Sequence, residues 1–581
     1  MKQDTKEIQM KALIAFALIV GCFFYFQCFV PYHLYFKEQI QLFIFSFGYF
    51  LSYFGKPGGL ACLSGDFLTQ FLYLKGGGAV VISLLLLVKW LLVSKTLNLL
   101  GTKTLTPLLA LFPVIAEWIF FSEISFSIAM SMAFLFPLLF FRLYTCIRNS
   151  VFSIISGILL VPILYFLAGS AMLLFPALVL IYDINNGKKQ LLYWLILFVL
   201  AGIFPYLVHS HFLLTVKQAY FYPFPTIKNG LSVFTLVGIA FLCCFRTIRE
   251  CENTIFSFSF TMILALIFAI GGLVITTNST REKILGMASE AYFENWNKVL
   301  EMGEKTKLQN PISTYYTNIA LSKQMQMGDR LMTFYQPFTS GLFLPVKPES
   351  SWFSIFFSSD AYFYTGDMNM AQHSAMLGMI FSPYQRSSRL MRRLVEINVI
   401  NDDVPAATKY LRILEATWFH KKQAVRMKKM LLAPNPEEYP ELQEKRSRIH
   451  KNDILRSSQD PKASLELLVK NNPDNRPALD YLLSYYLLNK DIPHFFETYT
   501  RYYKDKNAFV PKMYAEALLI YFAATHAKPA KITDYKISTN LVNDFNEYTQ
   551  LYESSQGDLE PVRKQFADTY WLYYHFATLK E

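Results

Sequence analysis

Two acidic residues in the first hydrophilic stretch of the chain have the type and the setting for general-base chemistry. Asp66 stands near a predicted helix start, and Glu38 lies close to Tyr32 and His33. A carboxylate at a membrane surface can take a proton from a hydroxyl group or bind a cation. The alternative for both is structural, because acidic residues near a helix start satisfy free backbone amides and favour the positive end of the helix dipole. We treat Asp66 and Glu38 as candidate catalytic residues.

A second hydrophilic stretch, residues 209–229, carries side chains that suit substrate binding. Its cationic groups can bind a phosphate, and its aromatic rings can form either a platform for a sugar or lipid headgroup or an interfacial belt. The candidate substrate-binding residues here are His209, His211, Lys217, Tyr220 and Tyr222. Because histidines at i and i+2 do not share a helix face, a metal site needs a third ligand. A divalent metal is a possible cofactor, and no residue is assigned as its ligand.

A further carboxylate stands inside an apolar run. Glu117 is part of the segment Pro113–Trp118. A carboxylate at membrane depth is a functional candidate by default, so Glu117 joins the candidates for substrate binding. The alternative is a carboxylate at a helix end that faces interfacial water. Lys89 also lies in an apolar segment, and we expect it to snorkel to the interface or to find a partner inside a helix bundle.

Apolar helices must position these groups, because 53% of the chain is hydrophobic and 17% is aromatic. A membrane-spanning helix needs about 20 apolar residues. The hydropathy pattern predicts about nine spans in a transmembrane helical domain over residues 1–277. The predicted spans are 10–32, 77–100, 105–121, 125–141, 150–168, 170–183, 190–208, 230–245 and 255–276. A tight turn around Gly169 separates the fifth from the sixth.

The first stretch between spans, residues 33–76, is too long for a simple connection and is expected to have structure of its own. Residues 38–54 are rich in aromatic side chains and predict a helix at the membrane interface. Gly55–Gly59 is a clear break. Ser64–Asp66 has the residue types of a helix start.

Lys and Arg in the short loops predict the orientation of the spans. The denser set is expected to face the cytoplasm and comprises Lys2, Lys6, Lys11, Lys103, Arg142, Arg148, Lys188, Lys189, Arg246 and Arg249. An odd number of spans then places the C-terminal half outside, so we expect a bacterial inner membrane protein with a periplasmic C-terminal domain. The net charge of +12 is mostly this orientation signal, and no basic block predicts a nucleic-acid partner.

This layout resembles the GT-C superfamily of membrane glycosyltransferases. The resemblance rests on the long first outside stretch at 33–76 with its acidic residue, on the compact helix hairpins after it, and on the second outside stretch at 209–229. It implies a transferase that takes a sugar from a polyprenyl-phosphate-linked donor at the outer face of the membrane. Asp66 or Glu38 would be the catalytic carboxylate, and a cation of the second stretch would bind the donor phosphate. The first stretch has no Asp-x-Asp or Asp-Glu signature.

Residues 278–581 predict an extracytoplasmic α-helical repeat domain. Apolar residues recur at helical spacing around similar turns, which stand at Gly328–Leu331, Gly366–Met368, Asp402–Val404 and Lys490–Ile492. The pattern resembles degenerate tetratricopeptide repeats, whose unit is 34 residues long. The resemblance implies stacked helix pairs with a concave face for a protein or peptide partner. The alternative is a helical shell that only stiffens or covers the membrane half.

Two aromatic stretches of this half are not expected to be free in water. Residues 337–360 form an apolar insert that we expect to pack on the membrane half or to enter the bilayer surface. The segment Tyr570–Phe576 is too aromatic for a disordered tail, so we expect it to be docked.

The sequence therefore predicts an all-α protein, in which a polytopic transmembrane bundle precedes a tetratricopeptide-like domain. The whole layout also resembles polytopic proteins of Gram-negative bacteria that have no assigned function. The leading hypothesis is a GT-C-like glycosyltransferase, with membrane lipids and a polyprenyl-phosphate-linked sugar as its partners. The alternatives are a non-enzymatic membrane-anchored scaffold for envelope assembly and a transporter or flippase. No phosphate-binding Gly loop, H-E-x-x-H or G-x-S-x-G motif supports ATP hydrolysis or proteolysis.

Overall fold

The computed structural model confirms the predicted all-helical fold class. It describes the whole chain except residues 1, 101–104, 225–229, 243–254, 347–349, 434–437, 450–459, 507–508, 528–532, 557 and 579–581. Helices hold 78% of the residues, and the described residues contain no strand. Three of the basic residues that predict the orientation lie outside the described residues: Lys103, Arg246 and Arg249.

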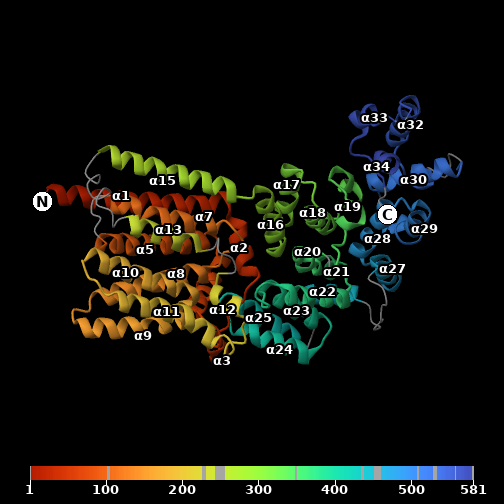
Figure 1. The fold of residues 1–581 in the computed structure, drawn as a ribbon. Helices are drawn as coiled ribbons and strands as arrows, with labels where there is room; N and C mark the ends of the chain where they lie inside the picture. Colours follow the sequence, from red (N-terminus) through yellow and green to blue (C-terminus); the bar gives the residue numbers. More distant parts are fainter. Residues whose placement is uncertain are drawn as a thin grey trace. The chain divides into compact units, whose positions relative to one another are not determined.

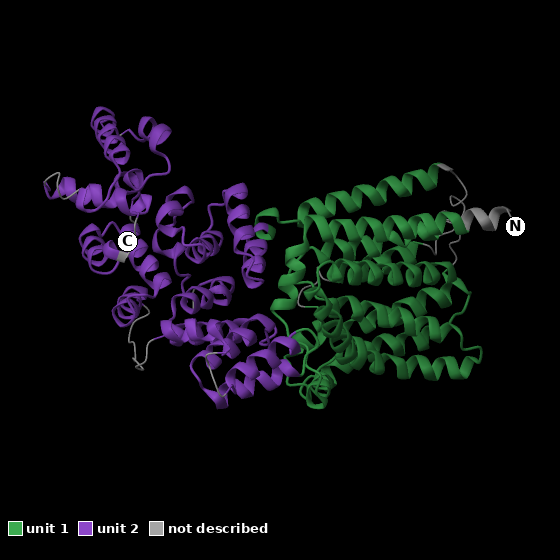
Figure 2. Ribbon diagram, turned by 180° about the vertical axis from the view of Figure 1, so that it is seen from behind, with its two compact units in different colours: residues 1–282, 416–419 green, residues 283–415, 420–581 purple. Residues whose placement is uncertain are grey.

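The chain divides into two compact units, drawn in green and purple in Figure 2. Unit 1 contains residues 1–282 together with Ala416–Phe419. Figure 1 shows its long helices running alongside one another. Its helices are α1 (Lys2–Phe24), α2 (Pro31–Gln39), α3 (Phe47–Ser52), α4 (Gly59–Thr69), α5 (Gly77–Leu99), α6 (Thr106–Leu109), α7 (Leu111–Phe121), α8 (Ile128–Thr145), α9 (Ser150–Ala168), α10 (Leu174–Asn185), α11 (Leu191–Val208), α12 (Val216–Phe221), α13 (Leu231–Leu242) and α15 (Ile255–Thr276).

Unit 2 contains residues 283–415 and 420–581, and the boundary between the units falls inside α16. Its helices are α16 (Ser279–Tyr292), α17 (Trp296–Thr306), α18 (Pro311–Lys323), α19 (Met327–Arg330), α20 (Trp352–Phe357), α21 (Ser359–Thr365), α22 (Met368–Phe381), α23 (Ser388–Ile400), α24 (Val404–Glu415), α25 (Lys421–Leu431), α26 (Pro440–Arg448), α27 (Pro461–Asn471), α28 (Arg476–Leu488), α29 (Ile492–Tyr502), α30 (Lys512–Ala524), α32 (Thr539–Ser554), α33 (Leu559–Phe566) and α34 (Tyr570–Phe576).

Among the described residues, six apolar segments are long enough to cross a membrane. They are Ile8–Phe29, Gly77–Leu99, Ile128–Thr145, Ser150–Asn185, Leu191–Val208 and Phe256–Thr276. The fifth and sixth predicted spans form the single 36-residue segment Ser150–Asn185, which a 3₁₀ turn at Gly169–Leu173 interrupts. The third and eighth predicted spans correspond to the shorter apolar helices Thr106–Phe121 and Leu231–Leu242. The structure thus supports a helical membrane protein and leaves the count of nine as a prediction.

The first outside stretch differs from its prediction. Residues 38–54 do not form one helix, because α2 ends at Gln39 and α3 begins at Phe47. Between them the backbone amide of Phe45 donates to the carbonyl of Ala416 at 2.7 Å. This contact from a distant part of the chain replaces a local helical hydrogen bond. The predicted helix start at Ser64–Asp66 is also wrong, because α4 begins at Gly59.

The short segment Ala416–Phe419 completes an aromatic cluster of unit 1. The Trp418 ring stacks on Phe45 with 4.7 Å between ring centroids and meets Phe67 edge-on at 5.4 Å. The Phe419 ring stacks on Tyr73 at 5.8 Å. Aromatic pairs at such distances add stabilisation beyond the area that they bury. The cluster therefore fixes the course of the first outside stretch around α4.

Several turns of unit 2 share one design. A residue in the left-handed conformation ends one helix, and the next residue is an aspartate whose side chain accepts from a backbone amide of the following helix. These pairs are Gly366 (φ 103°) with Asp367, Asp402 (φ 61°) with Asp403, and Lys490 (φ 59°) with Asp491. Three of the four predicted turns are thus interhelical turns. The fourth, Gly328–Leu331, lies instead mostly within the short helix α19.

Both aromatic stretches of unit 2 place large side chains in its interior. Within the described part of residues 337–360, Phe343 contacts Tyr481 at 5.5 Å between ring centroids, and the carbonyl of Phe357 accepts from the Tyr315 hydroxyl at 3.0 Å. These side chains of the insert form core of unit 2, and its expected packing on the membrane half or entry into the bilayer surface stays a prediction. The C-terminal aromatic helix α34 is docked as predicted, with Trp571 1% exposed.

Candidate functional site

Asp66 lies in the middle of α4, with a half-buried side chain. Its carboxylate accepts a hydrogen bond from the Tyr53 hydroxyl at 2.5 Å. The Tyr53 and Tyr49 hydroxyls are 2.6 Å apart, and the Tyr49 hydroxyl donates to the carbonyl of Leu42 at 3.1 Å. A chain of hydroxyl groups therefore runs from Asp66 into the buried part of the first outside stretch. Asp66 does not cap the start of its own helix, which was the structural alternative for this residue.

This arrangement brings the second outside stretch close to Asp66. Cys62 stands one helical turn before Asp66, and its thiol lies 3.7 Å from the hydroxyl of Tyr222. Burial and then the charge of Asp66 raise the pKa of Cys62 to about 12, so the thiol is neutral at physiological pH. Of the five candidates in residues 209–229, Tyr222 is the one for which the structure shows a side-chain contact with α4.

Both outside stretches form backbone hydrogen bonds with the end of α9 and the turn at Gly169, and this backbone crossing links them. The amide of Gly58 donates to the carbonyl of Tyr165 at 3.0 Å, and the amide of Ser170 donates to the carbonyl of Tyr222 at 2.8 Å. Gly169 has φ +65°, and a Cβ atom there would lie 2.3 Å from the Tyr222 carbonyl oxygen. Glycine is required at this point for both its conformation and the approach. The crossing fixes Tyr222 relative to α4.

Glu38, the other candidate catalytic residue, belongs to α2 of unit 1. It lies near the end of α2, and its side chain is 5% exposed. The start of the same helix is capped by Glu282, which accepts from the backbone amide of Tyr32 at 2.5 Å. Lys37 donates to the carbonyl of Phe121 at 2.9 Å. Burial lowers the pKa of Lys37 to about 7, although Glu123 and Glu282 oppose this effect.

The remaining candidates of the second stretch lie on its surface or bind to their own neighbourhood. His211 and Lys217 are exposed. The His209 ring is 2.5 Å from the carbonyl of Tyr206 in the preceding helical turn. The Tyr220 hydroxyl donates to the carbonyl of Gly202 at 2.5 Å. Their predicted role in substrate binding therefore rests on the sequence.

Glu117 forms a buried ion pair in the helix bundle. It is 0% exposed, as is its partner Lys89. The ammonium group of Lys89 also donates to the Ser131 hydroxyl at 2.6 Å and lies 5.0 Å from the centre of the Phe134 ring. Buried charges need such partners because an isolated ion is costly to take out of water. Glu117 therefore does not face interfacial water, and Lys89 is a bundle partner.

The described residues contain no group of three or more His, Cys, Asp or Glu side chains that could hold a metal ion. The reactive groups around Asp66 in the described part of unit 1 are its own carboxylate, phenol hydroxyls and a neutral thiol. These groups accept and donate protons, which is the requirement for general-base catalysis.

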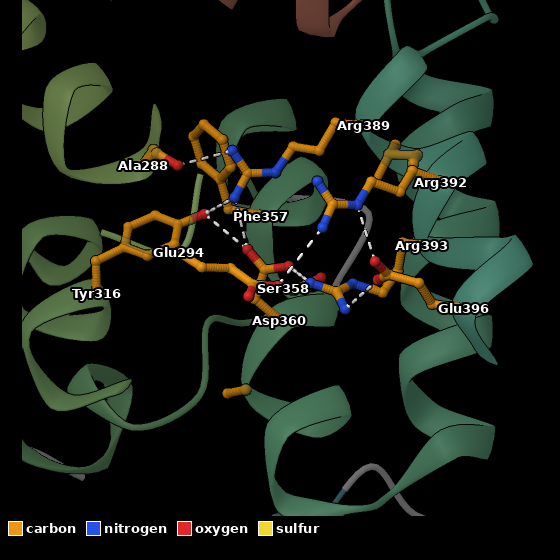
Figure 3. Close-up of polar contacts among 12 residues, drawn as sticks. Ala288, Glu294, Tyr316, Phe357, Ser358, Asp360, Arg389, Arg392, Arg393 and Glu396 are labelled. Carbon is orange, nitrogen blue, oxygen red and sulfur yellow. Dashed lines mark hydrogen bonds and ion pairs between the residues drawn. The ribbon is translucent and has the colours of Figure 1, made fainter. Parts of the chain in front are cut away.

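Unit 2 contains a buried charge network that the sequence reasoning missed (Figure 3). Asp360 of α21 accepts from Arg389 and Arg393 of α23, at 2.7 and 2.8 Å. Arg389 also donates to the Tyr316 hydroxyl at 2.7 Å and to the carbonyl of Ala288 at 3.0 Å. Burial would raise the pKa of Asp360, but the charges of Arg389 and Arg393 outweigh it and lower the pKa.

A second carboxylate extends the network along α23. Glu396 accepts from Arg392 and from Arg393, each at 2.8 Å. The sequence signal is the spacing Arg389, Arg392, Arg393 and Glu396, which places four charges on one face of a helix. The apolar residues of this helix, Leu390, Leu394 and Ile397, masked that signal because they alone predict an ordinary amphipathic helix.

The fold defines a class of protein: the described residues are all-helical and include six helices long and apolar enough to span a membrane. Within that class, the chain belongs to a family of unknown function (DUF6057), whose sequence model matches residues 6–577. No curated protein matches the chain. No solved structure matches it either.

Proposed function

We propose that the protein is a GT-C-like glycosyltransferase of the bacterial inner membrane, with unit 2 in the periplasm. The observation that carries the proposal is the neighbourhood of Asp66 on α4. Tyr53 donates to its carboxylate, and Cys62, one helical turn earlier on the same helix, contacts Tyr222 of the second outside stretch. A transferase needs a base and a donor site from these two stretches. A purely structural Asp66 would need no such neighbourhood.

In the proposed reaction, the Asp66 carboxylate takes the proton of an acceptor hydroxyl group. The acceptor oxygen then forms a bond to the anomeric carbon of the sugar, and the bond from that carbon to the donor phosphate breaks. Polyprenyl phosphate leaves with the electron pair. Lys217, which is exposed on α12, is the cation that we propose to offset the charge of the leaving phosphate.

A count of protons supports Asp66 as the base. The chain from Asp66 through Tyr53 and Tyr49 to the carbonyl of Leu42 has three contacts. With Asp66 ionised, the two phenols supply only two protons for them. Once Asp66 has taken a proton, it can donate to Tyr53, Tyr53 to Tyr49, and Tyr49 to Leu42, so that every contact holds one proton. The network thus stabilises the state that follows proton transfer.

The test replaces Asp66 by Asn and Tyr53 by Phe in cells from which the native gene has been deleted. Both variants are expected at normal membrane levels, with loss of activity for Asp66→Asn and a decrease of about tenfold or more for Tyr53→Phe, measured as transfer of sugar from the polyprenyl-phosphate donor. Tyr206→Phe is the matched control, because Tyr206 is 56% exposed. Unchanged envelope glycans in Asp66→Asn cells with normal protein levels would refute the proposal.

A scaffold for envelope assembly is the second candidate. It is favoured by the helix pairs of unit 2, in which α23 packs on α24 and α28 on α29 through left-handed turns capped by aspartate. Such pairs are the units of tetratricopeptide-like arrays, which bind peptides on a concave face. Crosslinking in cells discriminates the two candidates: a scaffold gives protein adducts on unit 2 that Asp66→Asn leaves unchanged.

A further inference from the structure

A pocket in unit 2 opens beside the charge network of α21 and α23. Its empty space, counted together with open solvent at its mouth, is about 300 Å³, and its lining includes Tyr292, Glu294, Tyr364, Arg392 and Arg393. Figure 3 shows Arg392 and Arg393 on neighbouring positions of α23, with Glu294 approaching from another segment. Nothing in the proposed function uses this pocket.

Arg392 has hydrogen-bonding capacity that the described protein does not use. Its Nε atom donates to Glu396 at 2.8 Å. With its amide oxygen turned inward, Gln423 lies 2.7 Å from this Nε and 3.1 Å from one terminal nitrogen of Arg392. The other terminal nitrogen has no hydrogen-bond acceptor among the described residues. The Arg392 side chain is 17% exposed. The N–H groups of this second terminal nitrogen therefore face the pocket opening rather than the core.

The carboxylates around the pocket are not equivalent. Asp360 and Glu396 are 5% and 9% exposed, and each already binds two arginines. Glu294 is 58% exposed and lies 3.5 Å from Arg392. A contact of that length on an exposed side chain contributes little. Glu294 is therefore the one lining carboxylate that an incoming anion can displace at low cost.

The surroundings of the pocket carry positive charge in excess. Lys323 places its ammonium group 4.2 Å from the centre of the Tyr364 ring, and it has no ion-pair partner among the described residues. Burial lowers its pKa to about 8, and the charges of Arg448 and Lys445 add to this, against Glu294 and Glu444. Because the charges of Arg448 and Lys445 disfavour the protonated form of Lys323, this region has a positive electrostatic potential.

We propose that this pocket binds a small oxyanion of the phosphate class, held by Arg392 and Arg393 after Glu294 has swung away. Planar guanidinium groups match the oxygens of a phosphate, and two of them that line the same pocket can bind it together. The ligand is either a free phosphate ion or the phosphate of a phosphomonoester. The excess charge around Lys323 adds a long-range attraction for either one.

The test is calorimetric titration of the full-length protein in nanodiscs at constant ionic strength, with sulfate, inorganic phosphate and glycerol 1-phosphate as probes. We expect saturable binding that Arg392→Gln weakens by about tenfold or more, because charge-assisted hydrogen bonds are lost. Glu294→Gln is expected to strengthen binding severalfold, since it removes the competing carboxylate. The matched controls are Arg501→Gln and Glu497→Gln, an exposed pair on α29, and both should bind as the unchanged protein does.

The pH dependence gives an independent readout, because the charge of sulfate is constant between pH 6 and 9. Sulfate binding is expected to weaken by about threefold as the pH rises through 8 and Lys323 loses its proton, and Lys323→Arg should bind equally at both ends of this range. Five side chains face Lys323, and none of their residue types has an ordinary pKa between 6 and 9. They are Tyr364, Arg448, Lys445, Glu294 and Glu444.

Three results would overturn the proposal: no saturable binding of any probe, equal affinities of Arg392→Gln and Arg501→Gln, or weaker binding by Glu294→Gln. Glu294→Gln keeps the proposal testable if Arg392→Gln fails to fold. Glu294 is a surface residue, so its replacement is expected to leave the fold intact. Binding of glycerol 1-phosphate identifies a phosphomonoester as a ligand. Binding of phosphate alone identifies the free ion.

Discussion

Glu516 on α30 is a buried carboxyl group of unit 2. One of its oxygens accepts from the backbone amide of Tyr570 at 2.6 Å, and the other has no hydrogen-bond partner among the described residues. Burial raises the pKa of Glu516 to about 7, although Tyr570 and Lys512 oppose it. The folded chain therefore holds a proton over a pH range in which the unfolded chain has lost it.

The sign of the pH effect follows from this raised pKa. Between pH 4.5 and 7 the folded state binds more protons at Glu516, so the contribution of this residue to stability falls as the pH rises and is constant above that window. A shift of this size corresponds to about 3 kcal/mol. Glu516→Gln is expected to gain that much stability relative to the unchanged protein between pH 4.5 and 7.5, measured by thermal unfolding in detergent. Glu301→Gln, an exposed substitution on α17, is the control. If Glu516→Gln and the unchanged protein differed in stability by the same amount at pH 4.5 and at pH 7.5, the raised pKa of Glu516 would be contradicted.

At the residue scale, the sequence shows which residue types are present and not which ones meet. Lys89 and Glu117 were each recognised as unusual in apolar segments, yet 28 positions separate them, and no local pattern predicts their pairing. The same holds for Asp360 with Arg389. Asp66 was singled out from its type and region, but its partner Tyr53 stands 13 positions away across a glycine break. Long-range packing decides such contacts.

At the scale of elements, the packing of α4 on α8 depends on one glycine. A Cβ atom at Gly65 would lie 2.3 Å from the backbone of Ala129, so a larger residue must push the two helices apart. Gly65→Ala is expected to cost about 1–3 kcal/mol and to reduce the yield of folded protein. Gly202→Ala is the matched control, because a Cβ there meets nothing within 4 Å. Equal melting temperatures of the two variants in detergent would show that α4 does not approach α8 closely.

The periodic elements were predicted well, and the irregular ones were not. Apolar helices such as α5 and α15 follow directly from hydropathy. The interhelical turns of unit 2 follow from residue types that favour left-handed and capping positions. By contrast, the stretch between α2 and α3 is extended where aromatic content predicted a helix, since Phe45 bonds to Ala416 from a distant part of the sequence. Tertiary contacts override local propensity at such places.

At the scale of the whole molecule, the orientation of the spans is a prediction open to direct measurement. In a cysteine-free background, Lys217→Cys is expected to react with a membrane-impermeant maleimide in intact cells. Lys189→Cys should react only after the membrane is permeabilised, because the denser basic loops stay in the cytoplasm. A reporter fused after the last residue should be active only outside the cytoplasm. Labelling of Lys189→Cys in intact cells would reverse the orientation and remove the basis of the proposed periplasmic chemistry.

The membership of Ala416–Phe419 in unit 1 has a consequence for biogenesis. During synthesis the rings of Phe45 and Phe67 leave the ribosome long before Trp418 does. Until then the aromatic rings of Phe45 and Phe67 lack their contact with Trp418 and need chaperones or lipid to cover them. A nascent chain stopped before residue 416 would thus lack part of unit 1, and unit 1 would be complete only after a segment deep within the second half of the polypeptide had been synthesised.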